Sequence, residues 1–313
     1  MQAPAPWTAL YPADESWNAP LTPRFLDEDL EAAARRWPDA VAIDSDQATL
    51  TFAQLRERCA RVARGLRDLG VGAGSHVALL LKNTPCHAIC FYAVLMAGGR
   101  VVNLSASTAL AQLRHQLEDA RVDVLVTSEQ FRAALAPADG AARAMRCIAV
   151  DEDDAALAPL ASDGGELDPL VRECARDEVA VLQYTGGTTG APKAAMLTHG
   201  NFSAVPHAMR LWTGDAVDPG RVLLVVLPLS HVFGLALMCL SVACGLKMLL
   251  RAGFDTDRTL RDVEGEDVAL FFGVPMMYSA LAASPRTPRT DWSRVRICGS
   301  GGAPLAGDTF DAF

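Results

Sequence analysis

The feature that most constrains the fold of this chain is a repeated alternation of short apolar runs with stretches of helical periodicity. The apolar runs indicate strands at His76–Leu81, Val101–Leu104, Val122–Val126, Cys147–Val150, Val179–Gln183, Arg221–Leu227, Lys247–Leu250, Ala269–Phe272 and Val295–Cys298. Between most of them, apolar residues recur every three or four positions, which is typical of amphipathic helices. Strand, helix, strand repeated in this way requires crossover connections. We therefore predict an α/β fold in which helices flank parallel sheets.

One helix is marked at both of its ends. Thr51 and Gln54 form a capping box at its start. Apolar residues then recur at spacings of three and four from Phe52 to Leu69, and Gly70 supplies a stop signal. We expect an amphipathic helix between these signals.

The composition excludes several classes of function. Half of the 313 residues are hydrophobic and 21% are charged, so a sizeable core can be buried. The net charge is −9 and no run of Lys or Arg occurs, which argues against nucleic acid as the main partner. The longest nearly uncharged apolar run, Val232–Leu246, is shorter than the roughly 20 residues that a membrane span requires. We predict a buried helix there, and neither a transmembrane segment nor a signal peptide.

The eight cysteines are scattered, and no pair has Cys-x-x-Cys spacing. We interpret them as small hydrophobic residues in a reducing compartment, and we expect a cytoplasmic protein. Cys86 and Cys90 share one face of a predicted helix, where core packing is favoured over a ligand pair. The acidic segment Asp151–Glu173 is expected to be an exposed connection with solvated charges rather than a metal site. Residues 1–24 contain five prolines and predict an irregular arm over the surface.

The segment Tyr184–Lys193 has the composition of a phosphate-binding loop. Its sequence is Tyr-Thr-Gly-Gly-Thr-Thr-Gly-Ala-Pro-Lys, and it follows an apolar run. Glycines let backbone N–H groups approach an anion, threonine hydroxyls add donors, and lysine adds a positive charge. The alternative is a hairpin turn or a flexible linker, but turns rarely need three hydroxyls. We expect an anion site at this segment.

Spacing excludes two common nucleotide-binding loops. A P-loop NTPase needs Gly-Lys-Ser/Thr where this chain has Ala191, Pro192 and Lys193. The dinucleotide pattern Gly-x-Gly-x-x-Gly also fails, because Thr189 stands two residues after Gly187. A different class of ATP-using protein is indicated.

Other predicted strands also end in Gly, Pro, Ser or His. These ends are Pro228–His231, Gly273–Pro275 and Gly299–Pro304. Ligands of parallel sheets bind outside the carboxyl ends of the strands. We therefore expect these loops and the Gly/Thr segment to share one crevice.

Four stretches together resemble the acyl-CoA synthetases of the adenylate-forming (acyl-activating, AMP-binding) superfamily. They are Tyr184–Lys193, Leu227–Gly234, Gly273–Tyr278 and Ser300–Leu305, in that order. The amino-acid sequence around the first stretch is most similar to that of the bacterial long- and medium-chain fatty acid CoA ligases. The resemblance implies a reaction in two steps. A carboxylate attacks the α-phosphate of ATP to give acyl-AMP and pyrophosphate, and the thiol of coenzyme A then displaces AMP.

The resemblance also implies a domain organisation. Residues 25–313 would form an incomplete large N-terminal domain of the acyl-activating enzyme fold, with the small C-terminal domain absent. Within it, about 75–210 would be one α/β subdomain with the phosphate loop. A second subdomain would combine about 25–70 with 220–313.

The family roles carry over to the matching positions. The ATP phosphates would be held by Thr185, Gly186, Gly187, Thr188, Thr189, Gly190 and Lys193. Lys193 would act catalytically on the departing pyrophosphate, and Thr188 or Thr189 would help to position Mg²⁺ indirectly. Gly302, Ala303 and Pro304 would lie along the adenine.

The acyl pocket is assigned by the same resemblance to His231, Phe233 and Tyr278. His231 would sit near the nascent acyl phosphate as a catalytic residue. The alternative for His231 is a satisfied core histidine at a helix start, and the alternative for Phe233 is core packing. His199 is expected to be structural.

The chain departs from the family pattern in three places. Ala194 follows Lys193 where glycine is usual, and Leu104 follows Asn103 where proline is common. The chain also ends at Phe313, before several family motifs, so we expect a portion of a longer ligase that cannot turn over alone. The alternatives are a non-catalytic nucleotide- or acyl-binding module, or an enzyme that loads a carrier protein. The expected partners are a fatty acid, ATP and CoA, while peripheral membrane contact and oligomeric state stay open.

Overall fold

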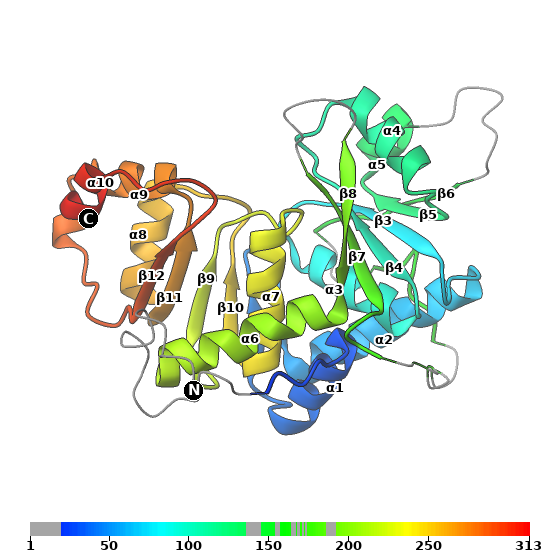
Figure 1. Ribbon diagram of the computed structural model, residues 1–313, viewed down its shortest axis with the longest axis horizontal. Helices are drawn as coiled ribbons and strands as arrows, with labels where there is room; N and C mark the ends of the chain where they lie inside the picture. Colours follow the sequence, from blue (N-terminus) through cyan, green and yellow to red (C-terminus); the bar gives the residue numbers. More distant parts are fainter. Residues whose placement is uncertain are drawn as a thin grey trace, which may run out of the picture.

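We describe the fold from a computed structural model, in residues 20–135, 145–153, 157–163, 167, 170, 172, 174–185 and 192–313. Two six-stranded sheets lie on either side of a layer of helices, as Figure 1 shows. The sequence prediction of sheets flanked by helices is confirmed. Most of the arm predicted for residues 1–24 lies outside the described residues.

The first sheet, called sheet A, has the strand order β12-β11-β9-β10-β1-β2. In that order its strands are Ile297–Ser300, Val268–Gly273, Val222–Val225, Lys247–Leu250, Val41–Asp44 and Thr49–Thr51. The second, sheet B, has the order β6-β5-β3-β4-β7-β8. Its strands are Arg146–Ala149, Val124–Thr127, His76–Leu80, Arg100–Asn103, Val179–Thr185 and Lys193–Thr198.

Each sheet is parallel apart from one edge pair. β2 pairs antiparallel with β1, and β8 pairs antiparallel with β7. The links inside these two pairs, residues 45–48 and 186–192, are far shorter than the dozen or so residues that a parallel crossover needs. The sequence did not indicate these antiparallel edges.

Ten α-helices and two 3₁₀ turns accompany the sheets in the described residues. The helices α1 to α10 are Leu26–Arg36, Phe52–Asp68, Pro85–Met96, Leu110–Asp119, Glu129–Leu135, His199–Thr213, Val232–Cys244, Thr256–Gly265, Pro275–Ala282 and Gly307–Ala312. The 3₁₀ turns η2 and η3 are Gly214–Val217 and Thr287–Arg289. The capping box of α2 is formed as predicted, with reciprocal hydrogen bonds between Thr51 and Gln54. Helix α1 was not predicted.

The inner strands of both sheets bury both of their faces. Because side chains alternate along a strand, Val77 and Leu79 of β3 face the helices between the sheets. Ala78 and Leu80 face α4 and α5 instead. Sheet A is arranged in the same way, with its outer face packed on α8 and α9. The main core therefore lies between the two sheets.

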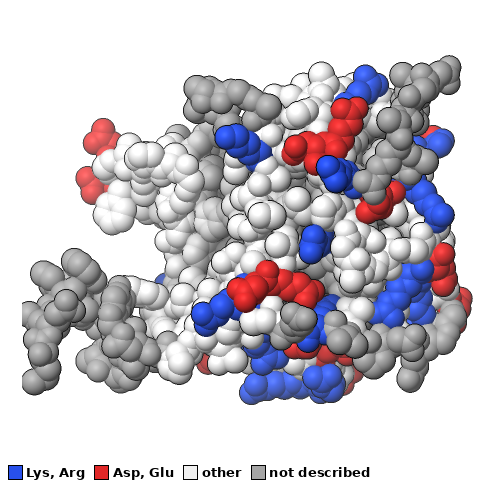
Figure 2. All heavy atoms as spheres, turned by 45° about the vertical axis from the view of Figure 1, so that its right-hand side comes forward, with Lys and Arg blue, Asp and Glu red and all other residues white. Residues whose placement is uncertain are grey.

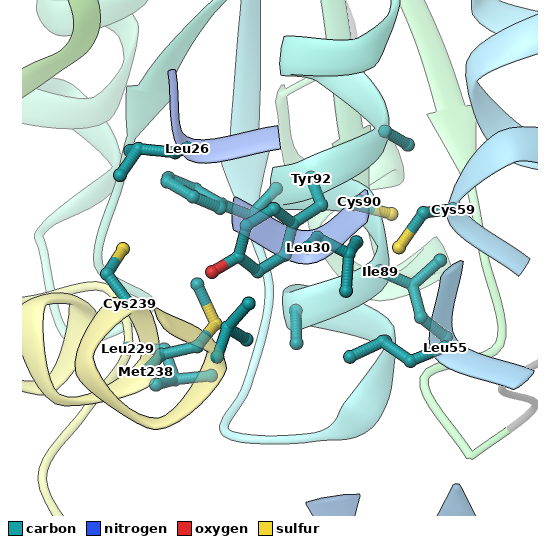
Figure 3. Packing of buried hydrophobic residues seen from close by; sticks show 14 of the residues in the cluster. Leu26, Leu30, Leu55, Cys59, Ile89, Cys90, Tyr92, Leu229, Met238 and Cys239 are labelled. Atoms are coloured by element: carbon teal, nitrogen blue, oxygen red, sulfur yellow. The ribbon is translucent and has the colours of Figure 1, made fainter. Parts of the chain in front are cut away.

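Tyr92 of α3 lies at the centre of that core, where Figure 3 shows it among side chains of α1, α2 and α7. Its hydroxyl pairs with the thiol of Cys239, and burial raises the pKa of both groups. Cys86 and Cys90 are buried in the same core, which is the packing role predicted for them. Helix α7 is buried along most of its length, as predicted from its apolar sequence.

The prediction of a solvated connection over Asp151–Glu173 holds for Asp151, Asp153 and Asp163, which are exposed, but is wrong for Glu152 and Arg172. Glu152 is 7% exposed, and its carboxylate accepts a hydrogen bond from the backbone N–H of Lys82. Arg172 forms a largely buried ion pair with Asp27 at 2.6 Å. A buried charge needs an opposite charge at close range. For Arg172 that charge is Asp27 of α1, a helix that the sequence did not predict.

The surface carries both signs of charge side by side. Figure 2 shows basic side chains lying next to acidic ones on the face turned toward the viewer. Ion pairs such as Arg56–Glu31, at 2.8 Å, join neighbouring helices. Within the described ranges, no helix combines the length and apolar character that crossing a bilayer demands.

Candidate functional site

A cavity of about 520 Å³ lies where strand ends of the two sheets face each other. Sheet B contributes the ends of β4 and β7 together with α4. Sheet A contributes the segment after β9 and the start of α9. The carboxyl ends of parallel strands are the usual place for a ligand, so this cavity is the candidate site.

The hairpin of β7 and β8 holds both flanks of the Gly/Thr loop. Thr185 ends β7 and is directly paired with Lys193 at the start of β8. Opposite residues of an antiparallel pair point to the same face of the sheet. Thr185 and Pro192 line the cavity, and the side chain of Lys193 is exposed. The other predicted phosphate ligands, Gly186, Gly187, Thr188, Thr189 and Gly190, lie outside the described residues.

His231 is placed at the first turn of α7. It is the N-cap residue of that helix, and its Nδ1 accepts a hydrogen bond from the backbone N–H of Phe233 at 3.2 Å. In the neutral ring the proton is then on Nε2, which becomes a donor. His231 is exposed and lines the cavity, so it is not a core histidine.

A glycine brings this helix start close to the preceding segment. A Cβ at Gly234 would stand 2.3 Å from the carbonyl oxygen of Pro228. Only glycine fits this approach without a shift of the backbone. The His-Val-Phe-Gly sequence therefore sets where His231 meets the cavity.

Phe233, Val274 and Met277 form the apolar side of the cavity. The ring of Phe233 packs edge-on against Phe272, with centroids 6.2 Å apart. A Cβ at Gly301 would stand 3.0 Å from the Phe233 ring, so the glycine-rich loop after β12 lies directly against it. This side of the cavity suits an apolar group.

The predicted adenine residues follow β12 in one exposed loop. Gly302 lines the cavity and has a φ of +84°, a conformation that favours glycine. Ala303 and Pro304 come next and are exposed. The loop reaches the same cavity as His231 through Gly302.

The structure does not bring Tyr278 to this cavity. Its side chain is 3% exposed, and its hydroxyl lies 2.9 Å from Gly299 O and 3.2 Å from Phe271 O. The prediction that Tyr278 lines the acyl pocket is therefore corrected. Val274 and Met277 line the cavity instead, because they lie three residues apart at the start of α9 and so share one face.

Sequence reasoning missed three cavity residues on sheet B. Asn103, Gln183 and Tyr184 all line the cavity. The Tyr184 hydroxyl donates to Asp119 Oδ2 at 2.6 Å, and burial and this carboxylate raise its pKa. The rule that ligands gather at strand ends could have identified Asn103, since it is the last residue of β4.

His199 lies away from the cavity. It is 2% exposed, and its Nδ1 accepts a hydrogen bond from the backbone N–H of Leu26 at 3.2 Å. Burial lowers the pKa of His199 to about 4. This placement agrees with the structural role predicted for it. In the part of the chain that the structure describes, no group of three or more His, Cys, Asp or Glu side chains could hold a metal ion.

Comparisons with known proteins place the chain among enzymes that bind AMP. The family described as AMP-binding enzyme matches residues 30–313. A long-chain-fatty-acid–CoA ligase of Bacillus subtilis (strain 168) is 32% identical over 339 residues, covering 97% of this chain and 60% of that protein. A feruloyl-CoA synthase of an Amycolatopsis species is 37% identical over 276 residues, covering 88% of this chain and 54% of that protein. The chain thus spans little more than half the length of these two relatives.

The fold has a close counterpart among solved structures. The inhibitor-bound N-terminal domain of FACL13 from Mycobacterium tuberculosis superposes with a TM-score of 0.82 at 25% identity. The match covers 92% of this chain and 72% of that chain. The two-sheet arrangement is therefore that of an adenylate-forming N-terminal domain.

Proposed function

Because the chain belongs to the family of AMP-binding enzymes, we propose that this protein is an ATP-dependent acyl-CoA ligase. The carboxylate of the acid attacks the α-phosphate of ATP, the bond to pyrophosphate breaks, and acyl-AMP forms. The sulfur of CoA then attacks the acyl carbon, its proton is lost, and AMP departs. The observation that carries the proposal is the meeting of Thr185, His231, Phe233 and Gly302 on one cavity.

The flanks of the Gly/Thr loop support a triphosphate at the sheet B side of the cavity. Lys193 would place a positive charge beside the β- and γ-phosphates. Thr185 would add a hydroxyl donor. Mg²⁺ would neutralise charge on the triphosphate, and Thr188 or Thr189, outside the described residues, would help to position it.

His231 would act on the reacting carboxylate. Its Nε2–H can donate to an oxygen of the carboxylate or of the α-phosphate, and either bond would stabilise charge that develops during transfer. Gly302 and the following Ala303 and Pro304 would border the adenine. We assign Phe233, Val274 and Met277 to the acyl group.

We propose a fatty acid as the substrate class. The apolar wall of Phe233, Val274 and Met277 supports an acid without a second charged group. The named activities of the relatives include a fatty acid ligase and a feruloyl ligase, so an aromatic acid is the competing candidate. The two-sheet topology also supports two subdomains, about 75–210 and about 25–70 with 220–313. The scattered cysteines support a cytoplasmic location.

The test is acid-dependent pyrophosphate release by the natural protein that contains residues 1–313. Aliphatic acids of increasing length and cinnamic-type acids are compared in the presence of ATP and Mg²⁺, with and without CoA. We expect the highest rate with an aliphatic acid, and about a hundredfold loss in Lys193→Ala. Lys82→Ala, which removes another exposed lysine, is the matched control.

The outcomes separate the candidates. A preference for cinnamic-type acids would replace the fatty acid with an aromatic one. Acid-dependent pyrophosphate release without a CoA thioester would indicate a carrier protein as acceptor. Absence of acid-dependent release would contradict the proposed function. An unchanged rate in Lys193→Ala would contradict the phosphate-binding role proposed for this lysine.

A further inference from the structure

The segment Leu227–His231, which follows β9 of sheet A, accepts hydrogen bonds from, or donates them to, three side-chain amides at strand ends of sheet B. Asn83 follows β3, Asn103 ends β4, and Gln183 lies near the end of β7. Their exposed fractions are 7%, 1% and 7%. Buried amides need hydrogen-bond partners. Most of the partners of these three amides lie in or next to sheet A.

Asn83 binds the base of the segment. Its Nδ2 donates to Leu227 O at 2.9 Å and to Arg251 O at 3.0 Å. Its Oδ1 accepts from the backbone N–H of Leu229 at 2.6 Å. Leu227 lies just after β9 and Arg251 just after β10, so one amide ties sheet B to two strands of sheet A.

Asn103 and Gln183 bind the part of the segment next to His231. Asn103 Nδ2 donates to Leu229 O at 2.9 Å and to Gln183 Oε1 at 3.1 Å. Gln183 Nε2 in turn donates to Ser230 O at 3.1 Å. The order of donors and acceptors fixes both amide orientations, because a carbonyl oxygen can only accept.

We propose that Asn83, Asn103 and Gln183 are positioning residues. They form an amide clamp that holds the segment Leu227–His231, which follows β9 of sheet A, against sheet B. The clamp thereby sets where the His231 ring enters the cavity. Amides do not titrate, so the clamp keeps its geometry as the pH changes. The part of His231 in a reaction rests on the proposed function, whereas the clamp itself does not.

The clamp predicts a local response to substitution. Asn103→Leu keeps a similar size but removes both donors, leaving Leu229 O and Gln183 Oε1 without that partner. Gln183→Met removes only the bond to Ser230 O and the acceptor for Asn103. Thr127→Val is the matched control, because it deletes a different buried hydrogen bond of sheet B, from Thr127 Oγ1 to Leu80 O at 3.0 Å.

Two measurements on the 313-residue chain test the clamp. The first is hydrogen exchange of the amides in 227–235, compared among variants at equal global stability. The second is the ¹⁵N spectrum of His231, assigned with His231→Gln, which reports whether the ring keeps one fixed tautomer.

We expect exchange in 227–235 to be about tenfold faster in Asn103→Leu than in Thr127→Val, since an unpaired buried group weakens the local structure. Gln183→Met should show a smaller change in the same direction. In the wild type, the ¹⁵N spectrum should show a single tautomer of His231. In Asn103→Leu, or in both clamp variants, we expect averaged nitrogen signals instead.

The clamp is overturned if both clamp variants exchange like Thr127→Val and keep the wild-type His231 spectrum. If Asn103→Leu does not fold, Gln183→Met decides by the same two measurements. Neither measurement uses a substrate. If pyrophosphate release fails but hydrogen exchange is altered in the clamp variants, the proposed function is refuted and the clamp stands. If pyrophosphate release is observed but hydrogen exchange is unchanged in the clamp variants, only the clamp is refuted.

Discussion

At the scale of a single residue, His231 combines an observed contact with a proposed role. Its Nδ1 caps α7 through the backbone N–H of Phe233, and we propose that its Nε2–H is the donor to the reacting group. Most residues that cap a helix are short and polar. A histidine in this place combines the cap with a donor that reaches further.

Two substitutions of His231 distinguish these tasks. His231→Asn keeps a capping oxygen but loses the longer Nε2–H donor, and His231→Ala loses both. We expect adenylate formation to fall about a hundredfold in either variant, because a donor to developing charge is lost. Only His231→Ala should also lose about 1 kcal/mol of stability, the usual value of an N-cap.

The checks are the rate of pyrophosphate release and the free energy of unfolding in denaturant. His115→Ala, at an exposed histidine of α4, serves as the control for loss of an imidazole. Wild-type rates in His231→Asn would show that the residue is only a cap.

At the scale of elements, two helices contain histidines that are buried without charge. His87 of α3 is 0% exposed, and burial lowers its pKa to about 4. His199, at the start of α6, is shifted to about the same pKa for the same reason.

These histidines predict a loss of stability in acid. Below an unfolded pKa of about 6.5, the unfolded chain binds protons that the folded chain does not bind until about pH 4. The contribution of the two histidines to the free energy of unfolding is therefore complete above pH 6.5 and decreases as the pH falls from 6.5 to 4. Each histidine adds a slope of at most about 1.4 kcal/mol per pH unit.

The measurement is the free energy of unfolding between pH 7 and pH 4.5. We expect His87→Met to reduce the slope in that window, and His115→Met, at an exposed position, to leave it unchanged. An identical slope in His87→Met and the wild type would show that His87 is not held neutral by its burial.

At the scale of the whole molecule, periodicity was enough to predict most elements but not their assembly. The β3 and β10 strands were found within one residue, because each is bounded by clear changes of pattern. Helix α1 was missed, although its apolar face meets α2 and α7. The division of strands between two sheets depends on contacts far apart in sequence, such as β1 beside β10.

The candidate site was predictable where a motif marks it. His231, Phe233 and Gly302 were found because they stand in short, recognisable strand-end sequences, and the structure brings them to one cavity. Tyr278 was misplaced because the sequence does not show which face of α9 meets the cavity. Asn103 and Gln183 were missed because their partners, Leu229 and Ser230, lie far along the chain, in the segment that follows β9 of the other sheet.

The central claim is that one cavity between the sheets receives an acyl adenylate. The most direct measurement is calorimetric titration of the 313-residue chain with a non-hydrolysable fatty acyl-adenylate analogue. Met277→Trp and Met276→Trp form a matched pair, because Met277 lines the cavity while its neighbour Met276 is 75% exposed. We predict binding to the wild type and to Met276→Trp, and at least about tenfold weaker binding to Met277→Trp, where the larger ring fills the space. No binding to the wild type, or equal affinity in the two tryptophan variants, would contradict the claim.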